Sequence, residues 1–100
     1  MTLHIVNKSP HATNALASCL RVVQPGESLL FIEDGVYAAL ATAEAGEAIV
    51  AAPDRVQFYA LESDVAARGL ANRLNVAVNV IDYAGFVELT ETHQPIQSWY

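Results

Sequence analysis

The stretch SLLFIEDGVYAAL at residues 28–40 decides the fold class of this chain. Its four consecutive apolar residues, 29–32, indicate a buried strand, and the acidic pair Glu33-Asp34 follows directly. Gly35 and a run of small residues come next, which is typical of a turn that leads into a helix. A buried strand that delivers two carboxylates to its carboxyl end resembles the places where open α/β sheets bind their ligands.

Apolar runs elsewhere alternate with helical patterns, which favours a parallel sheet joined by crossover helices. We expect strands at about 3–7, 28–33, 56–61 and 76–81, and helices at about 12–23, 35–41, 43–51, 63–69 and 83–92. The tail 95–100 adds a short edge strand or runs across the surface. The sequence therefore predicts one α/β domain over residues 1–100, with three layers and a small, mostly parallel sheet of about four or five strands.

Turn and cap residues mark the expected boundaries between these elements. Ser9 or Thr13 is expected to cap the first long helix, and Ser63 the helix at 63–69, because Ser and Thr are favoured N-caps. Gly69 is expected to stop that helix. The segment QPGE at residues 24–27 predicts a turn, and Pro-Asp at residues 53–54 a break in the chain.

The composition narrows the class of protein and of partner. Apolar residues make up 53% of the chain and the formal charge is −6, so a globular protein is expected and direct nucleic-acid binding is not. The longest apolar run is far shorter than the roughly 20 residues of a membrane helix, and no secretory signal is visible. Cys19 is the single cysteine, which excludes CxxC motifs. We therefore expect a cytoplasmic protein without membrane association.

Polar residues gather after the expected strands, and parallel strands bring such residues to one rim of the sheet. The members are Asn7-Lys8-Ser9, Glu33-Asp34, Glu62-Ser63-Asp64 and Asp82-Tyr83. They either form a functional rim or simply cap helices and end strands. One functional reading is a stand-alone, flavodoxin-like module that binds a small anion through Asn7, Lys8 and Ser9, although the acidic pair beside them weakens it.

Common enzyme signatures are missing: the chain has no GxGxxG, no GxxxxGK[ST] and no GxSxG. The histidines His4, His11 and His93 lack the spacing of a helical metal site, so neither metal nor cofactor is expected. His4 lies in a strand predicted to be buried, and a hydrogen-bonded core histidine is the preferred interpretation. His93 is expected near a helix C-terminus, where a cation is favoured.

Cys19 is the one candidate nucleophile. On a helical projection Ala12, Leu16, Leu20 and Val23 form the apolar stripe of the first helix, and Cys19 falls at its edge. A cysteine there is either a small core residue or a reactive thiol. Its position in the middle of the helix does little to favour a thiolate.

Several segments together resemble the DsrH/TusB family of small sulfur-relay subunits. They are LHIVNKSP, NALASCL, LLFIEDGVYAAL, ALESDVAARGL, VIDYAGFVELT and the C-terminal QSW, and they cover nearly the whole chain. The resemblance implies a DsrE-like, flavodoxin-like α/β layout. It also implies a cytoplasmic hetero-oligomer with sister subunits of the DsrE/TusD and DsrF/TusC types, which passes persulfide sulfur to an acceptor of the TusE/DsrC type.

Within this resemblance, the chain is not expected to be catalytic alone, because the main persulfide cysteine belongs to a sister subunit. Cys19, in the setting Ser18-Cys19-Leu20, is the candidate catalytic residue, either as an accessory sulfur site or only as packing. The relay serves either 2-thiolation of a tRNA wobble uridine or sulfur oxidation, and Cys19 and the start HIVNKSP look more like the latter branch.

The high apolar content leads us to expect subunit contacts on the surface. The aromatic candidates are Phe58, Tyr59, Tyr83, Phe86, Trp99 and Tyr100. Core packing is the alternative for Phe58 and Phe86. For Trp99 and Tyr100 the alternatives are a neighbouring chain and the sheet of the same chain.

Overall fold

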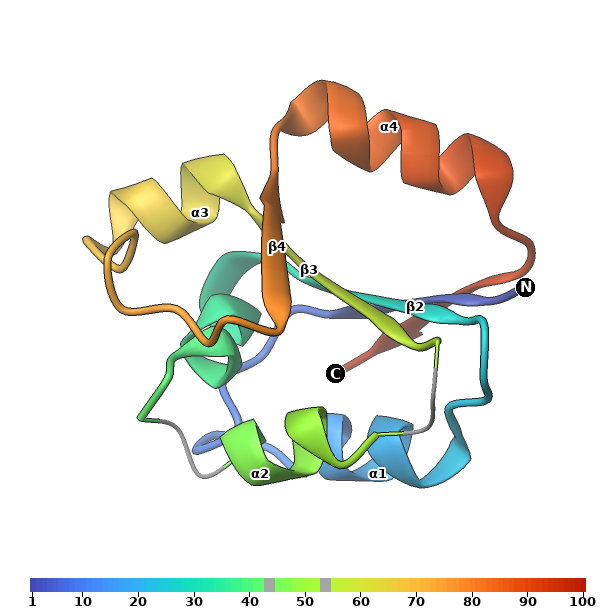
Figure 1. The fold of residues 1–100 in the computed structure, drawn as a ribbon, viewed down its shortest axis with the longest axis horizontal. Helices are drawn as coiled ribbons and strands as arrows, with labels where there is room; N and C mark the ends of the chain where they lie inside the picture. Colours follow the sequence, from blue (N-terminus) through green and yellow to red (C-terminus); the bar gives the residue numbers. More distant parts are fainter. Residues whose placement is uncertain (43–44, 53–54) are drawn as a thin grey trace.

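The computed structural model describes residues 1–42, 45–52 and 55–100, and within them five parallel strands form one sheet (Figure 1). The strands are β1 (Leu3–Val6), β2 (Ser28–Phe31), β3 (Gln57–Leu61), β4 (Val78–Ile81) and β5 (Ile96–Trp99). The tail is thus an edge strand, paired with β1. The α/β class and the parallel sheet predicted from the sequence are confirmed.

Helices cover both faces of the sheet. Figure 1 shows α1 (Ala15–Val22) and α2 (Ala45–Val50) on one side and α4 (Tyr83–Thr92) on the other. A 3-10 helix, η1 (Glu33–Ala39), follows β2, and α3 (Glu62–Ala67) follows β3. This arrangement confirms the three predicted layers. Residues 43–44 of the expected helix at 43–51, and the break expected at residues 53–54, lie outside the described residues.

The two faces of the sheet are buried to very different extents. We call the side of α1 and α2 the α1 face and the opposite side the α4 face. Among the residues that the structure describes, fourteen buried residues form the core of the α1 face, and only Leu3, Ile5 and Leu30 form that of the α4 face. The larger core consists of Val6, Leu16, Cys19, Leu29, Phe31, Val36, Ala38, Ala39, Ile49, Phe58, Ala60, Val65, Leu70 and Val78.

The central strands explain this core. All four residues of β1 and all four of β2 are buried, as is usual for parallel strands covered on both sides. Side chains alternate between the faces, so Leu29 and Phe31 point into the α1 face while Leu30 points into the α4 face. Phe31 and Phe58 stack with their ring centroids 6.5 Å apart. β2 therefore supplies the centre of both cores.

The position of Cys19 corrects the helical projection made from the sequence. Cys19 is fully buried and lies with Leu16 and Val23 in the stripe that faces the sheet, whereas Ala12 is exposed. The projection failed because α1 begins only at Ala15, so the residues before it do not extend its apolar stripe. Cys19 is therefore central in the stripe and not at its edge.

None of the predicted N-caps, Ser9, Thr13 and Ser63, occupies an N-cap position, whereas the predicted end of the helix at Gly69 is confirmed. Ser63 lies inside α3, whose N-cap is Leu61, and Ser9 does not cap α1. Thr13 accepts a hydrogen bond from the amide of Ala15 at 3.2 Å, although the N-cap position of α1 belongs to Asn14. Gly69 ends α3 with φ of +66°, a conformation that glycine adopts without strain.

The turn predicted at residues 24–27 is present and positions Glu27. The Glu27 amide donates to the Gln24 carbonyl at 3.1 Å, and Gly26 has φ of +88°, which is the pattern of a type II turn with Pro25 before the glycine. The same turn brings the Glu27 carboxylate within 2.8 Å of the Gln24 amide. Glu27 is thus held in place just before β2.

The strand order, β4-β3-β2-β1-β5, could not be predicted from the sequence. It differs from the 2-1-3-4-5 order of flavodoxin-like sheets. The chain adds β2, β3 and β4 on one side of β1 and then returns to place β5 on the other side. The first and last strands of the chain are therefore neighbours.

Candidate functional site

The rim at the carboxyl ends of the strands gathers two of the predicted polar segments. Asp34 follows β2 and Asp64 lies in α3, and Arg68 connects them. Nε and Nη2 of Arg68 donate to Oδ1 of Asp34 at 3.1 and 2.9 Å, and Nη1 donates to the backbone carbonyl of Asp64 at 3.1 Å. The hydrogen bond and charge of Asp34 raise the pKa of the Arg68 guanidinium above its usual value. Arg68 was not among the candidate site residues, because it is 34 residues from Asp34 and belongs to no recognisable motif.

Asp64 has a second role at the same rim. Its Oδ2 accepts a hydrogen bond from the backbone amide of Glu33 at 2.7 Å. Glu33 has φ of +50°, a left-handed conformation that is unusual for a residue with a side chain. Such backbone strain persists only where neighbouring contacts hold it. Asp64 therefore holds the turn that begins η1.

Gly35 shows how tightly this turn lies against β1. A Cβ atom on Gly35 would collide with the carbonyl oxygen of Val6 and would lie 3.4 Å from Cα of Asn7. The turn at residues 33–35 therefore lies next to Asn7. This agrees with the prediction that the polar residues after β1 and β2 share one rim of the sheet. The acidic residues Glu33 and Asp34 directly precede Gly35 in the chain, and the Asp34 carboxylate is paired with Arg68.

The other rim segments fit the capping alternative in part. Oδ1 of Asp82 accepts from the Gly85 amide at 2.8 Å and caps α4. Lys8 is exposed. In the described part of the chain, Oδ1 of Asn7 is buried and has no hydrogen-bond partner. Asn7 is thus the one rim side chain that leaves a buried acceptor for another group.

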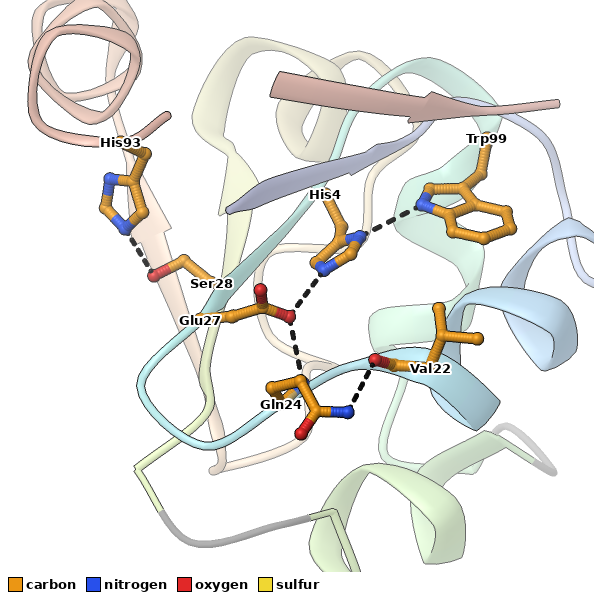
Figure 2. A network of polar contacts seen from close by, with 7 residues as sticks. All are labelled: His4, Val22, Gln24, Glu27, Ser28, His93 and Trp99. Atoms are coloured by element: carbon orange, nitrogen blue, oxygen red, sulfur yellow. Dashed lines mark hydrogen bonds and ion pairs between the residues drawn. The ribbon is translucent and has the colours of Figure 1, made fainter. Parts of the chain in front are cut away.

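A second polar cluster lies away from that rim and links the first strand to the last (Figure 2). His4, in β1, is only 5% exposed. Its Nε2 lies 2.9 Å from Oε1 of Glu27, and its Nδ1 accepts from the indole Nε1 of Trp99 at 3.1 Å. The prediction of a hydrogen-bonded core histidine is confirmed. Its partners could not be read from the sequence, because they are 23 and 95 residues away.

These contacts set the acidity of Glu27. Burial alone would raise its pKa, but hydrogen bonds from His4 and from the Gln24 amide outweigh that effect, so the pKa lies below its usual value. Glu27 is therefore ionised whenever the protein is near neutral pH. Its carboxylate accepts from two donors that belong to different segments.

His93 forms a comparable contact on the α4 face. Its Nδ1 lies 2.9 Å from the carbonyl of Leu89 at the end of α4, and its Nε2 lies 2.9 Å from Oγ of Ser28 (Figure 2). A carbonyl only accepts, so Nδ1 carries the proton. His93 thus satisfies a carbonyl in the last turn of α4, as its predicted position suggested, and joins that helix to β2.

The environment of Cys19 disfavours its thiolate. The residue is fully buried in the core of the α1 face. Burial, with a smaller contribution from the charge of Glu27, raises the pKa of the thiol to about 12. A thiol with that pKa is almost entirely protonated at neutral pH, and the thiolate is the form that attacks sulfur. Whether Cys19 ever carries sulfur stays a prediction.

The aromatic candidates divide into core and surface residues. Phe58 is 4% exposed in the larger core, and Phe86 packs against the α4-face core. Trp99 packs on its own chain, against the α1-face core. The rings that remain strongly exposed among these candidates are Tyr83 at 71% and Tyr100 at 80%. In the chain as described, no three His, Cys, Asp or Glu side chains are close enough to share a metal ion.

The geometry defines a small α/β protein whose described residues form a five-stranded parallel sheet. An ion pair between Arg68 and Asp34 lies at the carboxyl ends of its strands, and its cysteine is buried and not activated. No helix within the described ranges is long and apolar enough to cross a membrane. The chain belongs to the DsrH family, since the family model described as "DsrH like protein" matches residues 8–96.

Relatives and solved structures agree with this assignment. The proteins named TusB of Sodalis glossinidius and Serratia proteamaculans are each 39% identical to this chain over 97 residues, which is 97% of this chain and 99% of each relative. The crystal structure of the ychN protein from E. coli superimposes with a TM-score of 0.82 over 97% of both chains at 16% identity. The latter likeness supports the fold alone.

Proposed function

We propose that this chain is a non-catalytic subunit of a cytoplasmic sulfur relay that serves the 2-thiolation of tRNA. The observation that carries the proposal is family membership, because the DsrH model matches residues 8–96 and the TusB relatives align along nearly their entire length. The name TusB favours the tRNA-thiolation branch of the family. Cys19 and the N-terminal segment HIVNKSP had instead suggested the sulfur-oxidation branch. The relay delivers sulfur to an acceptor of the TusE/DsrC type.

We assign assembly to the surface that the chain leaves uncovered. α4 contains no buried residue, and it carries Tyr83 and Val87, which are 71% and 38% exposed. Ile96 on β5 is 46% exposed and points to the same face. Exposed apolar and aromatic side chains are typical of subunit contacts. Sister subunits of the DsrE/TusD and DsrF/TusC types are the proposed occupants of this surface.

Cys19 is assigned a packing role in this proposal. In persulfide transfer a thiolate attacks the outer sulfur of the donor, the S–S bond breaks and the donor leaves as a thiolate. A buried thiol with a pKa of about 12 supplies neither the access nor the thiolate for that step. The persulfide cysteine then belongs to a sister subunit, and this chain contributes shape and shielding.

The cellular role can be tested in the host organism. Deleting the gene should abolish or strongly reduce 2-thiouridine in tRNA, as measured by mass spectrometry of digested nucleosides, and the wild-type gene should restore it. A deletion strain with full 2-thiouridine would contradict the tRNA branch. Loss of sulfur oxidation with intact tRNA would instead favour the other branch of the family.

Assembly can be tested with surface variants that leave the core intact. Tyr83→Ala with Val87→Ser should reduce co-purification of the sister subunits, measured by affinity capture and size-exclusion chromatography with light scattering. Arg21→Ala, an exposed change on the opposite face, is the matched control and should not affect assembly. Circular dichroism should show the same helix content for both proteins. Unchanged assembly in the Tyr83→Ala, Val87→Ser protein would refute this surface.

The packing role of Cys19 can be tested separately. After exposure of the complex to a persulfide donor, mass spectrometry should show no adduct of about 32 Da, one sulfur atom, on Cys19. Cys19→Ala should retain sulfur transfer to the acceptor. An adduct on Cys19, combined with lost transfer in Cys19→Ala, would instead make it a relay thiol.

A further inference from the structure

The contact between His4 and Trp99 imposes a protonation state on the histidine. An indole nitrogen is a donor and never an acceptor, so Nδ1 of His4, 3.1 Å away, must carry the lone pair. The proton of the neutral ring then lies on Nε2 and is donated to Glu27 at 2.9 Å. A protonated His4 would place an N–H on Nδ1 against the indole N–H. The hydrogen bond seen in Figure 2 therefore exists only with a neutral His4.

Trp99 is also the main side-chain attachment of the last strand. β5 pairs with β1 along the edge of the sheet, and Ile96, Gln97 and Ser98 are all exposed. Trp99 is the β5 residue that is partly buried, and it packs against the core of the α1 face. The indole ring lies beside His4, with ring centroids 6.1 Å apart. Loss of the acceptor on His4 thus removes the polar anchor of this ring.

We propose that His4 is a protonation switch that controls the attachment of the C-terminal strand. The neutral ring holds Trp99 and β5 against β1. Protonation removes the acceptor for the indole, strengthens the contact with the Glu27 carboxylate, and releases Trp99 toward solvent. This switch is independent of the proposed sulfur relay and needs only this chain.

The groups around His4 support this direction of the response. Glu27, in the turn before β2, is ionised, and its carboxylate accepts from Nε2 of His4 at 2.9 Å whether the ring is neutral or protonated. Cys19, on α1 over the same face of the sheet, remains a neutral thiol in the same pH range. β5 contributes Trp99 and Gln97, which do not titrate, and β2 contributes the apolar Leu29. Protonation of His4 therefore leaves its contact with Glu27 in place and removes only its contact with Trp99.

His93 offers an internal contrast. Its Nε2 faces the hydroxyl of Ser28, which can either donate or accept, and its Nδ1 already donates to a carbonyl. Protonation of His93 therefore breaks no hydrogen bond, because the Ser28 hydroxyl only has to reverse its direction. We expect β5 to respond to His4 and not to His93.

The experiment uses Trp99 as its probe, since it is the single tryptophan of the chain. Fluorescence of the full-length protein is measured from about pH 8 to about pH 5, where histidines titrate, while NMR follows the His4 ring. The emission should shift to the red as His4 becomes protonated, with unchanged far-UV circular dichroism of the helices.

Two substitutions decide the outcome. His4→Gln keeps an acceptor for the indole and a donor for Glu27 but cannot titrate, so the red shift should disappear while the protein stays folded. His93→Gln is the matched control and should retain the shift. The proposal is overturned if His4→Gln shifts like the wild type, if the emission stays constant while His4 is protonated, or if His4 remains neutral across the range.

Discussion

The two faces of the sheet are built from the same strands but are buried very differently. Among the described residues the hydrophobic core of the α1 face has fourteen buried members, whereas that of the α4 face has three beneath a helix that has no buried residue of its own. Buried apolar area is the main favourable term in folding. The difference implies that the α1 face contributes most of the hydrophobic stabilisation of the chain and the α4 face much less.

The largest test of this comparison is a pair of truncations. Phe31→Ala removes a fully buried ring of the α1 face and should lower the free energy of unfolding by about 3–5 kcal/mol. Val87→Ala, on the α4 face at 38% exposure, should change it by less than about 0.5 kcal/mol. Urea unfolding measures both. Similar losses for the two variants would contradict the unequal division of the core.

Substitutions of Gly35, which lies against β1, and of Gly85, in α4, compare how tightly the two regions are packed. Gly35→Ala should cost about 2–3 kcal/mol, because its Cβ would collide with the backbone carbonyl of Val6, which cannot move without disturbing β1. Gly85→Ala places a Cβ 3.0 Å from Cβ of Ile81, but no residue of α4 is buried, so we expect the helix to accommodate this contact by a small displacement. Its cost should be offset by the better helix propensity of alanine, so thermal unfolding should show little change.

A large loss of stability in Gly85→Ala would show that α4 is fixed more firmly than its exposure indicates. That result would also weaken the assignment of this face to assembly. If instead Gly35→Ala unfolded like the wild type, the close approach of η1 to β1 would be incorrect.

The α1 face should also contain the main acid-sensitive contact. The folded pKa of Glu27 lies below its ordinary value of 4.5, so its contacts add stability that is fully present above about pH 4.5 and is lost as pH falls through the folded pKa. Glu27→Gln, which keeps an acceptor, should cost about 1 kcal/mol at neutral pH. The difference between the two proteins should shrink below about pH 4.5 in urea titrations at several pH values. A constant difference would exclude ionisation of Glu27 as its cause.

The sequence predicted the elements well because their signals are local. The apolar run 29–32, the turn at 24–27 and the pattern of α4 are each contained in a few consecutive residues, and all three elements are present. The cap at Ser63 was wrong because α3 begins at once after β3, which leaves Ser63 inside the helix. The preference of serine for N-cap positions does not indicate where the strand before it ends, so the start of α3 at Glu62 could not be predicted from Ser63.

The candidate sites depended on contacts that are distant in the sequence. The carboxylates after β2 could be placed at the rim, but the arginine that pairs with Asp34 is 34 residues away and carries no motif. His4 could be predicted to be buried, yet its bond to Trp99 follows from the placement of β5 beside β1. That placement is a property of strand order, which periodicity does not reveal.

A small effect is also expected at the rim, because its ion pair between Arg68 and Asp34 belongs to neither core. Arg68→Ala removes the pair with Asp34, whose side chain is 60% exposed, and should cost at most about 1 kcal/mol. Asp34→Ala should cost about the same, and the double variant should show a coupling energy below that value, which decreases further at high salt. Urea unfolding of the four proteins completes the cycle. Because Asp34 is mostly exposed, a coupling energy above about 2 kcal/mol would mean that this charge pair stabilises the protein far more than its solvent exposure indicates.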